Sequence, residues 1–128
     1  MKVRCISTQP TVEEAKKIAK LYIPGRMTYG LTLGQIYIVY SISILEGLVW
    51  VDILSSASQH LVSVPIFLFE ILDNRASQYW EIRIENTGEI LFWPSAFYRP
   101  YFHDHLSDYV PEVVEEFKKI RTKMDEEF

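Results

Sequence analysis

The residues of this chain with the clearest chemical potential lie together at positions 98–108, in the stretch YRPYFHDHLSD. The stretch combines the imidazoles of His103 and His105 with the carboxylates of Asp104 and Asp108. Imidazole and carboxylate groups are ligands for zinc and iron. The stretch also contains two tyrosines and one arginine, residue types that are enriched at the centres of protein interfaces. The sequence therefore supports two chemical interpretations, a metal-dependent hydrolase and a surface that binds another protein.

A metal site in this stretch would use His103, Asp104, His105 and Asp108 as ligands, with His60 as a further candidate. The hydrolase alternative uses His103, His105 and Asp108. Side chains two positions apart diverge by about 200° around a helix. In a strand, His103 and His105 share a face, but Asp104 points to the opposite face. The stretch also lacks a ligand motif such as H-E-x-x-H. The spacing thus disfavours a metal site, and we predict neither a metal nor another cofactor, with the hydrolase kept as the alternative.

Nucleophilic catalysis has one further candidate, the serine-rich loop that precedes His60. Ser55, Ser56 and Ser58 lie close to this histidine in the sequence, but the G-x-S-x-G elbow of a serine hydrolase is missing. A serine-rich segment after a strand is usually a loop. No catalytic residue is predicted, and enzymatic activity is the weaker expectation.

A partner-binding surface is the stronger interpretation of residues 98–108. Aromatic side chains would supply contact area, and acidic side chains would receive a basic partner. The predicted partner-binding residues are Tyr98, Arg99, Tyr101, Asp104 and Asp108. In the competing, purely structural interpretation, Ser107 or Asp108 caps the next helix and one histidine packs beside Tyr101 or Phe102. Whether residues 101–108 are exposed or packed under the last helix stays open.

Composition narrows the class of partner. The chain of 128 residues has 17 acidic and 13 basic residues and a formal net charge of −4, which disfavours binding to nucleic acid. Its single cysteine, Cys5, excludes an internal disulfide and is expected to be buried. No apolar run reaches the roughly 18 residues of a membrane span, and no signal peptide is recognisable. One cytoplasmic domain over residues 1–128, of open oligomeric state and without a membrane partner, is the simplest expectation.

Hydrophobic periodicity predicts a helix at each end of the chain. TVEEAKKIAKLYI has helical spacing, with Thr11 and Glu14 at capping-box positions and Pro24-Gly25 as the stop signal. Residues 110–127 have the same period and predict a C-terminal helix, for which Pro111 suits the first turn.

Alternating segments between these helices predict strands. Residues 31–45 indicate one strand, which turns at Glu46-Gly47 into a hairpin, and residues 79–93 indicate a second hairpin around Asn86-Thr87-Gly88. The predicted fold class is α+β, either an antiparallel sheet or a small SH3-like barrel flanked by the two helices. The strand order stays open.

The segment 31–72 resembles an SH3-like barrel, because LTLGQIYIVYSI is similar to its entry and SVPIFLFEIL to its closing strand, 3₁₀ turn and last strand. It lacks the ALYDY segment of peptide-binding SH3 domains. The whole chain resembles small bacterial proteins similar to the immunity proteins of polymorphic toxin systems, through P..LFEI.D, S.YWE.R, G....WP..F and YFHD.LS. This resemblance implies an inhibitor that binds a protein partner, such as a basic toxin, and blocks it by stoichiometric occlusion. A self-associating structural module is a further alternative.

Overall fold

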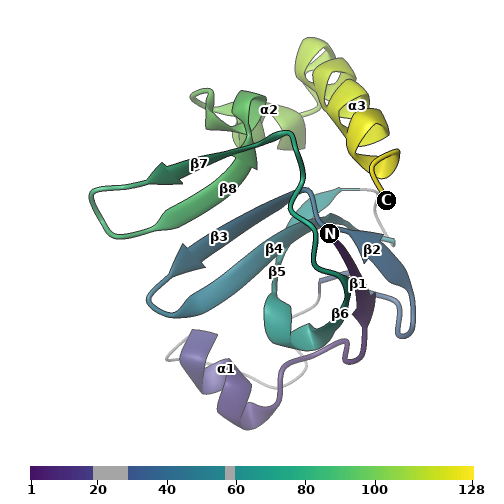
Figure 1. The fold of residues 1–128 in the computed structure, drawn as a ribbon, viewed down its shortest axis with the longest axis vertical. Coiled ribbons are helices and arrows are strands. Elements are labelled where there is room, and N and C mark those ends of the chain that lie inside the picture. Colours follow the sequence, from purple (N-terminus) through teal and green to yellow (C-terminus); the bar gives the residue numbers. More distant parts are fainter. Residues whose placement is uncertain (19–28, 57–59) are drawn as a thin grey trace.

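The computed structural model of the chain describes residues 1–18, 29–56 and 60–128. Its fold class is α+β, as predicted, and its strands form two antiparallel sheets (Figure 1). The smaller sheet has the order β2 (Ile36–Ile38), β1 (Lys2–Cys5), β6 (Phe69–Asp73). The larger sheet has the order β5 (Leu61–Pro65), β4 (Leu48–Leu54), β3 (Ser41–Leu45), β8 (Ile90–Pro94), β7 (Trp80–Ile84). The barrel alternative is wrong, because each sheet in the described part keeps two edge strands.

The segment predicted as one strand over residues 31–45 contains two strands in different sheets, since β2 lies in the smaller sheet and β3 in the larger. Val39 and Tyr40, which connect them, are both buried, and each packs in a different hydrophobic cluster. The N–H of Val39 donates to the C=O of Met1 at 3.1 Å, and the N–H of Tyr40 donates to the C=O of Asp52 at 2.9 Å. The chain changes sheet here because two consecutive side chains enter two different cores.

The helices are α1 (Val12–Ile18), α2 (Phe102–Ser107) and α3 (Pro111–Asp125), with 3₁₀ turns at η1 (Ile66–Leu68) and η2 (Ser95–Tyr98). The predicted capping box of α1 is confirmed. The N–H of Thr11 donates to Glu14 Oε1 at 2.9 Å, and the N–H of Glu14 donates to Thr11 Oγ1 at 3.1 Å. The predicted end of this helix at Pro24-Gly25 lies outside the described residues. No helix in the described ranges is long and apolar enough to cross a lipid bilayer.

Both predicted hairpins are present, as the pairs β3–β4 and β7–β8. The expectation that Ser107 or Asp108 caps the last helix is wrong, because these residues end the separate short helix α2. The N–H of Asp108 donates to the C=O of Asp104 at 2.9 Å at that end. Val110 occupies the position before α3, without a side-chain hydrogen bond, and Pro111 begins the helix.

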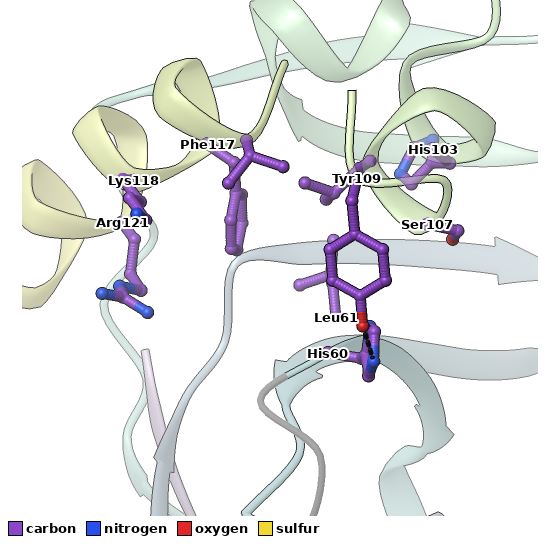
Figure 2. Close-up of a pocket in the computed structure, with 10 residues that line it drawn as sticks. His60, Leu61, His103, Ser107, Tyr109, Phe117, Lys118 and Arg121 are labelled. Carbon is purple, nitrogen blue, oxygen red and sulfur yellow. Dashed lines mark hydrogen bonds between the residues drawn. The ribbon is translucent and has the colours of Figure 1, made fainter. Parts of the chain in front are cut away.

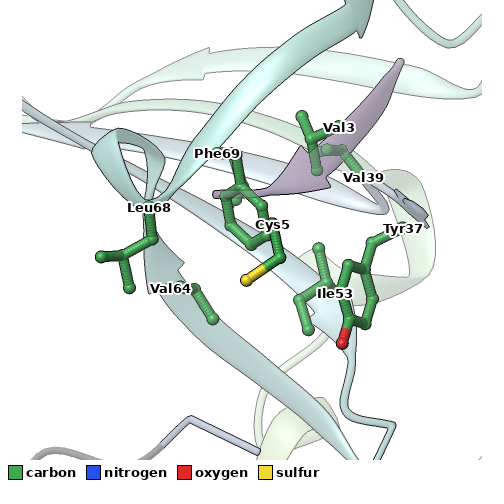
Figure 3. Close-up of a cluster of buried hydrophobic side chains, with 9 residues drawn as sticks. Val3, Cys5, Tyr37, Val39, Ile53, Val64, Leu68 and Phe69 are labelled. Atoms are coloured by element: carbon green, nitrogen blue, oxygen red, sulfur yellow. The ribbon is translucent and has the colours of Figure 1, made fainter. Parts of the chain in front are cut away.

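Two hydrophobic clusters hold these elements together. The first involves both sheets and contains Val3, Cys5, Val39, Ile53, Val64 and Leu68 among others (Figure 3). Cys5 is buried there, as predicted, and burial raises the pKa of its thiol. The second cluster joins the larger sheet to η2, α2 and α3 through Tyr40, Phe97, Phe102, Val113, Phe117 and Met124. This second cluster fixes the position of α2, and therefore of residues 98–108.

Candidate functional site

Helix α2 and the residues next to it form an exposed surface of acids and tyrosines. Tyr101 is 70% exposed and Tyr109 is 63% exposed, and Asp104 and Asp108 are exposed between them. We call these four residues the α2 surface. The structure therefore resolves the open question about residues 101–108, since Phe102 is buried under the helix and most of the polar groups face outward.

The two tyrosines of the α2 surface have an uncommon backbone conformation. The φ angles of Tyr101 and Tyr109 are 63° and 57°, in the left-handed region that a bulky side chain rarely occupies. The only other non-glycine residue with positive φ in the described part is Glu46, in the β3–β4 turn. Tyr109 lies outside the predicted site, and the sequence carries no signal for its exposure, because aromatic residues in left-handed turns have no distinctive composition.

The other predicted binding residues are engaged by the protein itself. The ring of Tyr98 stacks on that of Trp93 with centroids 5.0 Å apart, and its hydroxyl donates to the C=O of Glu81 at 2.5 Å. The guanidinium of Arg99 donates two hydrogen bonds to the carboxylate of Glu116, at 3.1 and 2.6 Å. Tyr98 and Arg99 thus brace α3 and the β7–β8 hairpin against η2, and they offer a partner less free polar surface than α2 does.

The structure separates the two histidines of the alternative metal site. His103 points inward, with its ring 5.1 Å from that of Trp93 and 5.3 Å from that of Phe97. His105 is exposed, with its ring 6.1 Å from that of Tyr101. The predicted packing of one histidine beside Tyr101 or Phe102 is present, since the ring of His103 also lies 5.7 Å from that of Phe102. No group of three or more histidine, cysteine, aspartate or glutamate side chains among the described residues could hold a metal ion.

A row of polar side chains lies on the larger sheet, on strands β3, β4 and β5, with its first two members buried and the third, Ser63, exposed. Ser41, Asp52 and Ser63 are direct cross-strand neighbours in the sheet register. The hydroxyl of Ser41 donates to Asp52 Oδ2 at 2.5 Å, and that of Ser63 donates to Asp52 Oδ1. Asp52 is only 7% exposed. An acid with its two oxygens held in this way is fixed in orientation, because each oxygen has its own donor.

The carboxyl of Asp52 and the imidazole of His103 influence each other in this setting. Burial raises the pKa of Asp52, although hydrogen bonds from Ser41 and Ser63 and the nearby His103 oppose that shift. Burial lowers the pKa of His103, although Asp52 and Asp104 oppose it. Both dominant effects favour the neutral forms, since each group loses hydration when charged.

Two cavities adjoin this pair. The first, of about 300 Å³, is lined by Ser43, Asp52, Leu61, Ser63, Trp93 and His103. The second, of about 230 Å³, lies under α2 and is lined in part by Leu106, Val114, Phe117, Lys118 and Arg121 (Figure 2). Leu61 and His103 line both. At the mouth of the second cavity, the hydroxyl of Tyr109 lies 2.5 Å from His60 Nε2, which ties the α2 surface to the start of β5.

Sequence reasoning missed Asp52. Its signal is a single acid within the apolar strand LVWVDIL, and it becomes meaningful only when the register places a serine on each neighbouring strand beside it. The serine-rich loop before His60 has a structural role, because Ser55 Oγ and Ser56 Oγ both donate to the C=O of Gly30, at 3.1 and 3.0 Å. Ser58 lies outside the described residues.

Functional inference for this chain rests on the geometry of its residues, because comparisons with known proteins add no support. No protein-family profile, no curated protein and no solved structure matches this chain.

Proposed function

We propose that this protein is a protein-binding module, of the immunity-inhibitor type, which occludes a basic partner with its α2 surface. The observation that carries the proposal is the pair of exposed, left-handed tyrosines on either side of two exposed aspartates. Tyrosine is enriched at interface hot spots because it buries a large area at a low cost in side-chain entropy.

The backbone of the α2 surface supports this proposal. A non-glycine residue in the left-handed region costs about 1–3 kcal/mol, and such residues persist where the surrounding structure enforces them, often at functional sites. Here Tyr101 directly precedes the buried Phe102, and Tyr109 is held by its hydrogen bond to His60. The two tyrosines are therefore presented in fixed positions, which reduces the entropy lost on binding.

The charges of the α2 surface indicate the chemistry of the partner. Asp104 and Asp108 form no ion pair with any residue that the structure describes. Two unpaired carboxylates beside aromatic rings complement lysine and arginine side chains on a partner, and they would accelerate its association at low salt. The net charge of −4 acts in the same direction.

The immunity-type assignment, the SH3-like character of residues 31–72 and a cytoplasmic location belong to the same proposal. Their support is the sequence resemblance. The proposal also includes the prediction that the two terminal helices flank the strands. The metal-dependent hydrolase gains no support from a specific observation, because His103 and His105 point to different sides of α2.

Charge reversal on the α2 surface tests the proposal. With the product of the neighbouring gene as the partner, Asp104→Lys is expected to raise the dissociation constant by about tenfold or more at 50 mM salt and to reduce its salt dependence. Isothermal titration calorimetry at 50 and 300 mM salt measures both effects. Asp108→Lys is expected to behave in the same way.

Glu13→Lys is the matched control, because Glu13 is an exposed acid on α1, at the opposite end of the molecule in Figure 1. This variant carries the same change in net charge, so it isolates the position of the charge from its amount. An unchanged dissociation constant for both aspartate variants would remove the α2 surface from the interface. A loss of affinity equal to that of Glu13→Lys would show a general effect of net charge.

A further inference from the structure

The outer edge of β7 is an unpaired sheet edge. Within the described residues, β7 pairs only with β8, and it is the last strand of the larger sheet. Figure 1 shows the β7–β8 hairpin projecting from the body of the protein, with its turn end away from the helices. An edge strand presents backbone N–H and C=O groups that can pair with another strand.

The hairpin turn shows which backbone groups point outward. The N–H of Glu85 donates to the C=O of Glu89 at 2.8 Å, across the end of the hairpin. Alternate residues of an antiparallel strand direct their backbone groups to the same side. Arg83 and Glu81 therefore direct theirs toward β8, and Ile84 and Ile82 direct theirs outward.

The side chains of this edge are unusual for a strand that ends a sheet. Ile82 is 62% exposed and Ile84 is 74% exposed, on one face of the hairpin. Natural edge strands are usually protected from pairing by charges, prolines or bulges. The opposite face carries Glu81 and Arg83, which are half-exposed and only 3.5 Å apart within the chain.

We infer that this edge binds a second copy of the same chain, with the two β7 strands antiparallel about a twofold axis at Ile82. In this register, Ile82 lies opposite Ile82 of the second copy, and their outward N–H and C=O groups form reciprocal hydrogen bonds. Glu81 of each copy lies opposite Arg83 of the other. Trp80 lies opposite Ile84, so the apolar face of one hairpin continues into the next.

The charges of Glu81 and Arg83 favour this register, and they favour a second copy of the chain as the binding partner. A shift by two residues in one direction places Glu81 opposite Glu81, and a shift in the other direction places Arg83 opposite Arg83 and Glu81 opposite Glu85. Like charges directly opposite each other destabilise a strand pair, whereas opposite charges stabilise it. The strand WEIRI is thus complementary to itself in one antiparallel register, and a second copy supplies that complement.

Neighbouring contacts leave the edge free for pairing. The Arg83 guanidinium lies 4.0 Å from the centre of the Tyr98 ring. This contact holds the Arg83 side chain on the face of the sheet and leaves the backbone edge of β7 uncovered. The N–H of Trp80 already donates to the C=O of Ser77 at 3.3 Å. At each end of the proposed intermolecular ladder, the remaining hydrogen bond therefore runs from the N–H of Ile84 in one copy to the C=O of Trp80 in the other. The paired edges would join two five-stranded sheets into one continuous sheet.

Two variants with opposite charge reversals test this interface, first alone and then mixed with each other. In size-exclusion chromatography with light scattering, the wild type is expected to approach twice the chain mass of 15.0 kDa as its concentration rises. Glu81→Arg and Arg83→Glu are each expected to remain monomeric, because each places like charges opposite each other at two positions. An equimolar mixture is expected to restore the dimer, since every arginine then faces a glutamate. The double variant Glu81→Arg/Arg83→Glu is expected to dimerise alone.

Arg4→Glu is the control, because Arg4 pairs with Glu70 on the smaller sheet, in a central strand. It is expected to keep the wild-type mass. Hydrogen exchange adds a second readout, in which the amides of Ile82 and Ile84 become protected in concentrated wild type but not in either single variant. A wild type that stays monomeric at several hundred micromolar, dimers that survive both single reversals, or a mixture that stays monomeric would each overturn the inference.

Discussion

Replacing Phe97 with alanine is expected to lower the free energy of unfolding by about 3–5 kcal/mol, as for other large-to-small substitutions at buried aromatic positions. Phe97 is 1% exposed. Its ring stacks on that of Phe102 at 5.0 Å and lies 6.3 Å from that of Phe117, so it joins η2 to α2 and α3. Alanine would leave a cavity where three elements meet, and these elements cannot all move inward to fill it.

Urea unfolding and thermal melting measure this effect. Because a domain of this kind is stable by only about 5–15 kcal/mol, Phe97→Ala is expected to lower the melting temperature by about 10–20 °C. Leu33→Ala is the control, since Leu33 is 65% exposed and its truncation is expected to change stability by about 0.5 kcal/mol or less. Similar losses in the two variants would show that Phe97 is not the centre of this cluster.

The features of the fold that the sequence predicts depend on neighbouring residues. Thr11 and Glu14 form their capping box because both partners lie within one turn of the helix. Glu46-Gly47 forms the turn of the β3–β4 hairpin, and both residues have positive φ there, as such a turn requires. In each case the interacting groups are close in the chain, so their spacing is enough to predict the contact.

The features that the sequence does not predict depend on distant residues. Alternation continues through Val39 and Tyr40, and nothing local marks the change from the smaller sheet to the larger. That change is fixed by hydrogen bonds to Met1 and Asp52, at the start of the chain and in another strand. The burial of Asp52 has the same origin, because its two serine donors come from strands whose pairing is not visible in the sequence.

The sequence indicates which residues of the candidate site could bind a partner, but not which of them are exposed, for the same reason. Composition identified residues 98–108, and the structure presents Tyr101, Asp104 and Asp108 at the surface. Composition could not show that the side chain of Tyr98 is engaged by the protein, because its contacts with Trp93 and Arg83 come from the β7–β8 hairpin. Nor could it show that His103 points toward Asp52.

The pair formed by Asp52 and His103 is expected to give single variants with opposite dependence of stability on pH. The folded pKa of Asp52 is raised above its ordinary value of 3.8, so its stabilising effect is complete below that pH and is lost as pH rises through the folded pKa. The folded pKa of His103 is lowered below its ordinary value of 6.5, so its effect is complete above that pH and is lost as pH falls.

In the wild type these two effects oppose each other between the ordinary pKa values of Asp52 and His103, 3.8 and 6.5. The unfolded chain has an ionised aspartate and a protonated histidine in this range, whereas the folded protein favours the neutral forms of both. The pair therefore carries the same number of protons in each state, and it contributes no slope. Asp52→Asn removes the opposing group, so its stability is expected to fall as pH decreases, relative to the wild type. His103→Gln is expected to lose stability as pH increases.

Each slope is expected to have the stated sign and to be no steeper than about 1.4 kcal/mol per pH unit, the value for one proton. Loss of the partner strengthens both slopes, because Asp52 raises the pKa of His103 and His103 lowers that of Asp52. Urea unfolding at half-unit steps from pH 4.5 to 6.5 measures them, and subtraction of the wild-type curve removes the contribution of all other carboxyl groups. The double variant Asp52→Asn/His103→Gln should regain the wild-type slope, since neither titrating group remains. A flat difference curve in either single variant would instead mean that burial does not shift the pKa of the remaining group in the stated direction.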